Sequence, residues 1–128
     1  MGLIDKLAIA AAEDLKSIEV EVPEWGGFVR LKEMSGSRVQ QFWESCRDDK
    51  GQIIRTVVQP NLLKCSLVDA QDLPLFNDDD ISVLMGKNAA VLMRLFDAAQ
   101  KLNGMGAPEA AVKNSEAATT GGSPSVSA

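Results

Sequence analysis

The residues most suggestive of function are at one short turn, Pro23-Glu24-Trp25-Gly26-Gly27, and at Phe28 just after it. Proline fixes φ and glycine permits positive φ, so this composition predicts a tight turn. A tryptophan at a turn tip has two interpretations. It folds back over the core, or it anchors a partner, because tryptophan is over-represented among binding hot spots. We therefore predict a partner-binding site at Glu24, Trp25 and Phe28, and we leave both interpretations of Trp25 standing.

The residue pattern does not indicate catalysis. The sequence has no histidine, which removes the commonest general base and the commonest metal ligand. A nucleophile would need Asp, Glu or Lys as its base, and their spacing singles none out. Gly26-Gly27 and Gly121-Gly122 lack the strand, the helix and the lysine that accompany a phosphate-binding loop. We predict a protein that is not an enzyme and uses no cofactor.

The aspartates from Asp69 to Asp80 form the one candidate metal site. A calcium-binding loop needs oxygen ligands at alternating positions, a central glycine and a closing glutamate. The middle of this stretch is instead Leu73-Pro74-Leu75-Phe76, and no closing glutamate follows. The run of aspartates that ends the stretch fits a helix capped by Asn77, because the helix dipole favours anions in the first turn. We predict structural aspartates and no metal site.

Composition and charge narrow the class of partner. The 128 residues, 45% hydrophobic and 24% charged, suit one soluble domain with a core. A net charge of −5 with scattered Lys and Arg argues against nucleic acid, which needs a concentrated basic face. Leu7 to Ala12 is apolar but too short to span a bilayer, so no membrane partner is expected. Cys46 and Cys65 lack metal-ligand spacing and are predicted to be reduced, buried thiols of a cytosolic protein.

The turn joins two short runs with a period of two. Valines alternate with glutamates before it, and apolar residues alternate with basic ones after it. This pattern is typical of strands with one apolar face, and it predicts an antiparallel hairpin over about residues 17–33. The predicted register pairs Val22 with Val29 and Val20 with Leu31 on one face, and Glu21 with Arg30 and Glu19 with Lys32 on the other.

Elsewhere the apolar residues recur at helical spacing. Pro60 interrupts one such run, and proline inside a helix costs about 3 kcal/mol or more. We therefore expect a kink or break near Gln59, with strand as the alternative for residues 53–58. The first predicted helix is an arm over residues 3–16. The second is capped by Ser35 and has the stripe Val39, Phe42, Trp43 and Cys46. One helical piece then precedes Pro60, and a second runs from Asn61 to about Val68. The last two helices are one capped by Asn77 and ended by Gly86, and one capped by Asn88 and ended by Gly104, with the stripe Leu92, Leu95, Phe96, Ala99 and Leu102.

These elements predict a mainly helical α+β fold with one N-terminal antiparallel hairpin packed on helices, because a hairpin alone is marginal in water. We assign residues 1–16 to a loosely held N-terminal helical arm and residues 17–104 to the α+β domain. Residues 105–128 form a C-terminal tail. Its last ten residues are Thr, Gly, Ser, Pro and Ala with a single valine, which is too polar a composition to join a core.

Four stretches, in this order and spacing, resemble the tail assembly chaperones of long-tailed bacteriophages. The resemblance covers about residues 18–104. The stretches are Val20-Glu21-Val22-Pro23-Glu24-Trp25-Gly26-Gly27 followed by a strand, Leu67-Val68-Asp69 leading to Pro74-Leu75-Phe76, Asn77-Asp78-Asp79-Asp80 before Leu84, and Leu95-Phe96-Asp97-Ala98-Ala99 with Leu102-Asn103-Gly104.

The resemblance implies a chaperone that binds the phage tape measure protein before the tail tube polymerises, keeps it soluble and helps recruit tail tube subunits. It implies a late protein of the host cytoplasm that is absent from the mature virion. A longer form of the chain, made by ribosomal frameshifting, often accompanies such proteins. The alternatives are a small virion connector retained in the particle and a bacterial adaptor unrelated to phage. The oligomeric state, a homo-oligomer included, is left open.

Overall fold

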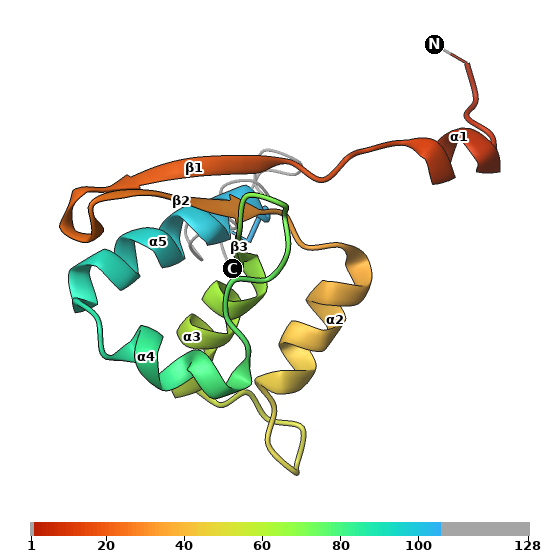
Figure 1. The fold of residues 1–128 in the computed structure, drawn as a ribbon. Coiled ribbons are helices and arrows are strands. Elements are labelled where there is room, and N and C mark those ends of the chain that lie inside the picture. The colour runs from red at the N-terminus through yellow and green to blue at the C-terminus, as the bar shows by residue number, and fades with distance from the viewer. Residues whose placement is uncertain (1, 106–128) are drawn as a thin grey trace, which may run out of the picture.

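The structure, a computed structural model, describes residues 2–105, so the predicted tail of residues 105–128 lies outside the described residues except for Met105. Helices cover one face of a small sheet, and α1 stands apart from them beyond the start of β1 (Figure 1). The predicted α+β class is confirmed. In chain order the elements are α1 (Lys6–Ala11), β1 (Ser17–Val22), the 3-10 turn η1 (Pro23–Trp25), β2 (Gly27–Lys32), α2 (Gly36–Ser45), α3 (Arg55–Ser66), β3 (Leu67–Val68), the 3-10 turn η2 (Asp78–Asp80), α4 (Ile81–Met85) and α5 (Ala89–Leu102).

The hairpin forms, but the predicted register is wrong by two residues. The turn is a single 3-10 turn closed by Gly26 at φ 83°, which is short enough for Val22 to pair with Gly27. A shift of two residues keeps every side chain on its face of the sheet, so the predicted apolar and polar faces are retained. The observed pairs are Ile18–Leu31 and Val20–Val29 on the inner face, and Glu19–Arg30 and Glu21–Phe28 on the outer face, in place of Val22–Val29, Val20–Leu31, Glu21–Arg30 and Glu19–Lys32.

A third strand, β3, completes the sheet and was not predicted. The strand order is β1-β2-β3, and β3 lies antiparallel to β2 with Leu67 opposite Leu31 and Val68 opposite Arg30. The segment predicted to stay helical to Val68 leaves the helix at Ser66. Residues predicted to form the last turn of the helix form a strand instead. The side chain of Leu67 is fully buried on the inner face of the sheet.

Helix α3 continues through Pro60, so of the predicted kink or break near Gln59, the break is wrong. The proline forfeits one backbone hydrogen bond. Packing offsets this cost, because Pro60 is itself buried and Leu62 and Leu63 lie in the core. Asn61 was predicted to begin a second helical piece. It instead donates its side-chain amide to the carbonyl of Ser45 at 3.2 Å and ties α3 to the end of α2.

The helix boundaries that depend on caps agree with prediction. Each capping side chain accepts hydrogen bonds from backbone N–H groups that have no partner within their own helix. Around η2 the capping is reciprocal. Ser35 accepts from the N–H of Arg38, and Asn88 accepts from the N–H groups of Ala90 and Val91. Asn77 and Asp80 form a capping box, and Gly104, at φ 72°, follows α5.

The core lies between the inner face of the sheet and α2 to α5. Both predicted helix stripes contribute to it. Trp43 is partly buried and lies against Phe42, with 4.7 Å between ring centroids. Cys46 is buried and Cys65 is only partly so; neither is in a disulfide. The buried cluster comprises Val22, Leu31, Met34, Phe42, Cys46, Leu62, Leu63, Leu67, Leu84, Val91, Leu92, Leu95 and Ala99.

The N-terminal arm contrasts with this core. Helix α1 is shorter than the predicted 3–16 and buries none of its residues. Leu7 and Ile9 are 79% and 64% exposed. Between residues 2 and 105, the helices are too short or too polar to cross a membrane.

Candidate partner-binding surface

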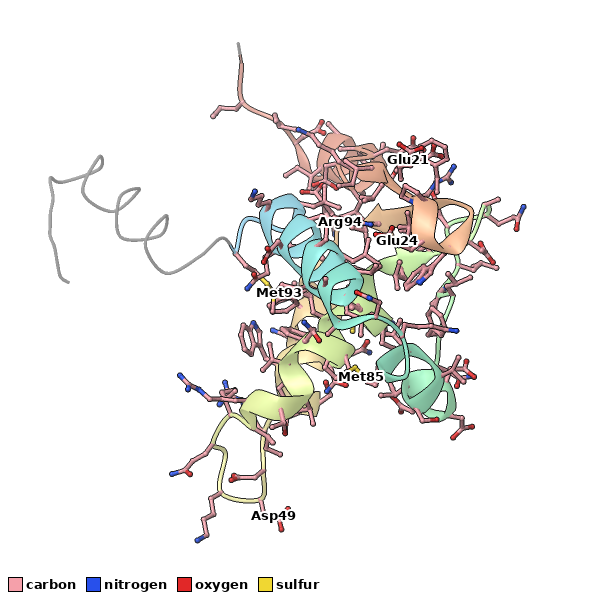
Figure 2. All side chains as sticks on the ribbon, turned by 90° about the vertical axis from the view of Figure 1, so that its left-hand side faces the viewer. Glu21, Glu24, Asp49, Met85, Met93 and Arg94 are labelled. Atoms are coloured by element: carbon pink, nitrogen blue, oxygen red, sulfur yellow. The ribbon has the colours of Figure 1, made fainter. Side chains whose placement is uncertain are left out.

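The carboxylate of Glu24 forms an ion pair within the protein. This carboxylate, in η1, accepts two hydrogen bonds from Arg94 on α5, with Oε1 to Nη2 at 2.9 Å and Oε2 to Nη1 at 3.4 Å (Figure 2). The Arg94 guanidinium, together with a backbone hydrogen bond, lowers the pKa of Glu24 below its ordinary value. A paired arginine and carboxylate fix geometry as well as charge. Glu24 therefore holds the hairpin turn against α5.

Trp25 and Phe28 differ in how much surface they offer. Trp25 ends η1 with 36% of its surface exposed, so the ring is partly covered and partly accessible. Phe28 is 66% exposed on the outer face of β2, opposite Glu21. Exposed apolar side chains mark a contact surface when they are contiguous, and Phe28 shares the lining of one groove with Leu75, which is 45% exposed. The structure thus places Phe28 more clearly at a surface than Trp25.

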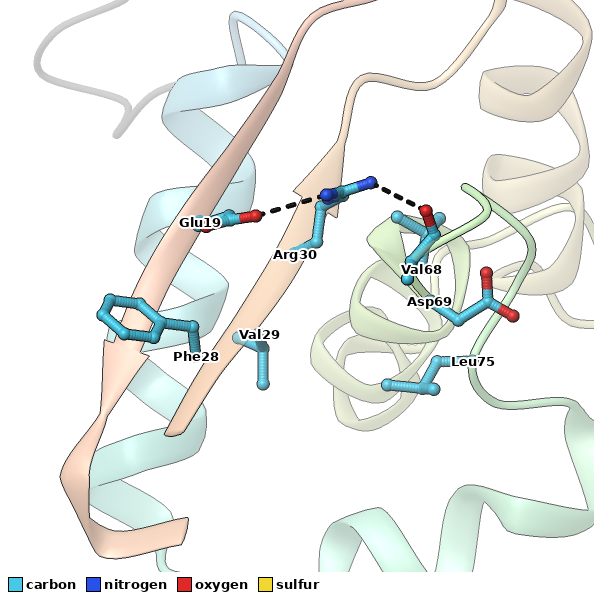
Figure 3. A pocket seen from close by; sticks show the side chains of 8 residues that line it. Glu19, Phe28, Val29, Arg30, Val68, Asp69 and Leu75 are labelled. Atoms are coloured by element: carbon cyan, nitrogen blue, oxygen red, sulfur yellow. Dashed lines mark hydrogen bonds and ion pairs between the residues drawn. The ribbon is translucent and has the colours of Figure 1, made fainter. Parts of the chain in front are cut away.

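Phe28 lines a groove on the outer face of the sheet (Figure 3). The groove arises because β3 ends at Val68, opposite Arg30, and the chain then bends away. Among the described residues, the first part of β2, before Arg30, therefore has no neighbouring strand on that side. Its volume is about 280 Å³. The lining residues are Glu19, Phe28, Val29, Arg30, Val68, Asp69, Ala70 and Leu75.

An ion-pair network borders this groove. Arg30 donates to Glu19 at 3.2 Å, to Asp72 at 2.9 Å and to the carbonyl of Ala70 at 3.3 Å, and Lys32 lies 3.5 Å from Asp72. Hydrogen bonds to Asp72 and then Glu19 raise the pKa of Arg30, and the bond from Arg30 lowers the pKa of Asp72. The network ties the chain after β3 to the face of the sheet.

The bend after β3 is built by two aspartates. The Asp69 carboxylate accepts from the N–H groups of Gln71 and Leu73 at 2.8 and 3.0 Å. Asp72 takes φ 64°, a left-handed conformation that aspartate tolerates better than most residues. The N–H of Leu75 then donates to the carbonyl of Leu67 at 3.1 Å and returns the chain to the groove. Both aspartates therefore have structural roles here.

The chemistry available in the groove is that of binding. Its lining residues carry no hydroxyl, thiol or amine side chain. Phe28 and Leu75 supply exposed apolar surface, and Glu19 and Arg30 beside them are already paired with each other. Such a site can take an apolar side chain of a partner and orient it by the flanking charges. Among residues 2–105, no group of three or more acidic, Cys or His side chains is placed to hold a metal ion.

Sequence reasoning identified Phe28 but missed the rest of the groove. Val68 and Leu75 come from a segment read as a helix end and a turn. The signal for them was the pair Leu67-Val68 followed by a short polar bend and Pro74, a pattern typical of two short strands joined by a turn.

The fold and the groove define a small α+β domain with one helix-covered sheet face and one face suited to binding a partner. No family model matches the chain, and no curated protein matches it. Among solved structures the chain is similar to the tail assembly chaperone of bacteriophage HK97. The TM-score is 0.55 and the identity 28%, over 76% of this chain and 89% of that chain. The predicted resemblance to phage tail assembly chaperones is confirmed. It supports a role in tail assembly, and a chaperone as neighbour favours a non-enzymatic role.

Proposed function

We propose that this protein is a phage tail assembly chaperone that binds the tape measure protein, keeps it soluble and helps recruit tail tube subunits. The observation that carries the proposal is the likeness to the HK97 chaperone, which extends over 89% of that chain. The groove beside Phe28 supports the binding step, because an accessible apolar site can cover an apolar side chain of a long helical partner before that partner is packaged.

The fixed position of the hairpin turn also supports this role. Glu24 and Arg94 fix the turn on α5, so Trp25 is presented in a constant position beside the sheet. A preorganised aromatic side chain binds at a lower entropy cost than a mobile one. The proposed tape-measure surface therefore comprises Trp25, Phe28 and the groove, with Glu24 in a supporting position.

The proposal includes where and when the protein acts. It works in the host cytoplasm, late in infection, and leaves before the virion matures. A longer form of this chain, made by frameshifting, would bring the tail tube protein to the bound tape measure protein.

Co-expression with the tape measure protein encoded in the same phage tests this function. The intact chain is expected to raise the soluble fraction of that partner, and Phe28→Ala to reduce the gain. Val83→Ala is the matched control, since Val83 is also an exposed apolar residue, at 57%, but lies on α4. No gain in solubility from the intact chain would overturn the proposal.

Mass spectrometry of purified mature tails tests the timing. The chain is expected to be absent from them. Its presence at a stoichiometric level would contradict the chaperone role and favour a connector retained in the particle.

A further inference from the structure

Strand β1 is the outermost strand of the sheet, and among the described residues it has a neighbour, β2, on one side only. The edge extends over six residues, Ser17–Val22, with no proline or glycine. Natural edge strands are usually protected by prolines, bulges or lysines because an open edge is a template for another strand. This edge has no proline, bulge or lysine, and its charged side chains are the carboxylates of Glu19 and Glu21.

The register shows which backbone groups face outward. The N–H of Glu33 donates to the carbonyl of Lys16 at 2.8 Å, continuing the ladder between β1 and β2. In antiparallel strands, residues bonded to the neighbour alternate with residues whose N–H and C=O groups point away. Ile18, Val20 and Val22 therefore bond to β2, and Ser17, Glu19 and Glu21 direct their backbone groups to the free edge.

The two sides of this edge differ in chemistry. On the outer face lie the carboxylates of Glu19, which is paired with Arg30 of β2, and of the exposed Glu21. On the inner face, a groove of about 540 Å³ separates the edge from α5. Ile18, 38% exposed, contributes to its apolar part. The other lining residues are Arg94, Asp97, Ala98, Lys101 and Leu102.

These charges argue against a second copy as the occupant. An antiparallel pair of two β1 strands centred on Val20 would place Glu19 of each copy opposite Glu21 of the other. Like charges directly opposite are destabilising in a sheet, whereas opposite charges stabilise the pair. The complementary strand carries basic residues on its outer face and apolar residues toward the groove.

We propose that the β1 edge binds an extended segment of a partner protein in which Lys or Arg alternates with apolar residues, adding a fourth strand to the sheet. The basic side chains lie opposite Glu19 and Glu21, and the apolar ones lie opposite Val20 and Ile18, over the groove. Backbone hydrogen bonds supply affinity and the alternating side chains supply specificity. This surface shares Glu19 with the lining of the Phe28 groove, but the proposal does not depend on the proposed function.

Amide hydrogen exchange of the full chain, followed by NMR, tests the proposal directly. The probe is a capped peptide of alternating Lys and Val. The peptide is expected to slow exchange at Ser17, Glu19 and Glu21 by about tenfold or more, while Ile18 and Val20, already bonded to β2, change little. The same peptide with Glu in place of Lys is expected to give no protection.

Two further variants separate strand addition from general attraction between charges. Methylating the peptide amides that face β1 is expected to abolish binding, and methylating the other amides is expected to preserve it. On the protein, Glu21→Lys is expected to weaken peptide binding about fivefold. Glu44→Lys, the same change on the exposed surface of α2, is expected to leave it unchanged.

Several outcomes would overturn the proposal. Equal binding of the Lys and Glu peptides would remove its charge basis, and protection at Phe28 and Arg30 in place of β1 would move the site to the outer groove. Protection of Ser17, Glu19 and Glu21 without peptide would show the edge already occupied, by a second copy if it grows with protein concentration and by the chain's own residues if it does not.

Discussion

The two faces of the sheet use the same strands for different purposes. On the inner face Val22, Leu31 and Leu67 are fully buried under the helices. On the outer face Phe28 is 66% exposed, and Arg30 links Glu19 to Asp72. Burying one aliphatic side chain contributes about 1.5–3 kcal/mol, whereas exposed ion pairs contribute little. The inner face therefore holds the fold together, and the outer face is available for a partner.

The largest expected effect is on the inner face. Leu31→Ala removes a fully buried side chain from the middle of the core, and the free energy of unfolding is expected to fall by about 2–5 kcal/mol. Urea denaturation followed by circular dichroism measures it. Phe28→Ala on the same strand is the matched control, with an expected loss below about 1 kcal/mol. Equal losses at the two positions would contradict the division between faces.

The next effect concerns binding by the outer face. Phe28→Ala is expected to weaken the complex with the tape measure protein about tenfold or more, because exposed aromatic residues often dominate a binding interface. Isothermal titration calorimetry with a soluble fragment of that partner measures the change. Val83→Ala, a truncation at a similarly exposed apolar residue on α4, serves as control. If both variants bind as tightly as the intact chain, the groove is not the contact surface.

The effects expected for Trp25→Ala combine a small loss of stability with a loss of binding. Since Trp25 is partly exposed at the turn, Trp25→Ala is expected to lower the melting temperature by less than about 4 °C and to weaken partner binding. Differential scanning calorimetry and the same titration give the two readings. A much larger drop in melting temperature with unchanged binding would assign Trp25 to the core.

Local residue chemistry was enough to predict the caps and the two faces of the hairpin. Ser35, Asn77 and Asn88 cap their helices through neighbours a few residues away. The alternation of apolar and charged residues sets each strand's faces whatever the register. The register itself was missed, because it depends on how tightly η1 turns, and registers two residues apart bury the same faces.

The remaining errors have a non-local cause. Helix α3 tolerates Pro60 because the surrounding core buries this residue, which no local pattern records. Strand β3 is two residues long and exists through its pairing with β2. For the same reason sequence reasoning found Phe28 but not Val68 and Leu75, which reach the groove from another part of the chain.

The smallest expected effect is the pH dependence of the outer-face network. The pKa of Asp72 is lowered chiefly by the hydrogen bond from Arg30. A carboxyl whose pKa is lower in the folded state adds stability above its unfolded pKa, about 3.9 for aspartate, and this stability is lost as pH falls through the folded pKa. Asp72→Asn is therefore expected to flatten the fall in melting temperature below about pH 4.

The matched control for this change is Asp49→Asn, in the loop between α2 and α3 that projects away from the sheet (Figure 2). Its melting temperature is expected to follow the acid dependence of the intact chain. An unaltered slope in Asp72→Asn would show that the network does not contribute to stability.

The most direct test of the outer face as the partner-binding surface is an NMR titration of the labelled chain with a soluble fragment of the tape measure protein. The largest chemical shift changes are expected at the amides of Phe28, Arg30, Val68 and Leu75. Changes confined to α2 and α3, with these four amides unmoved, would contradict this expectation.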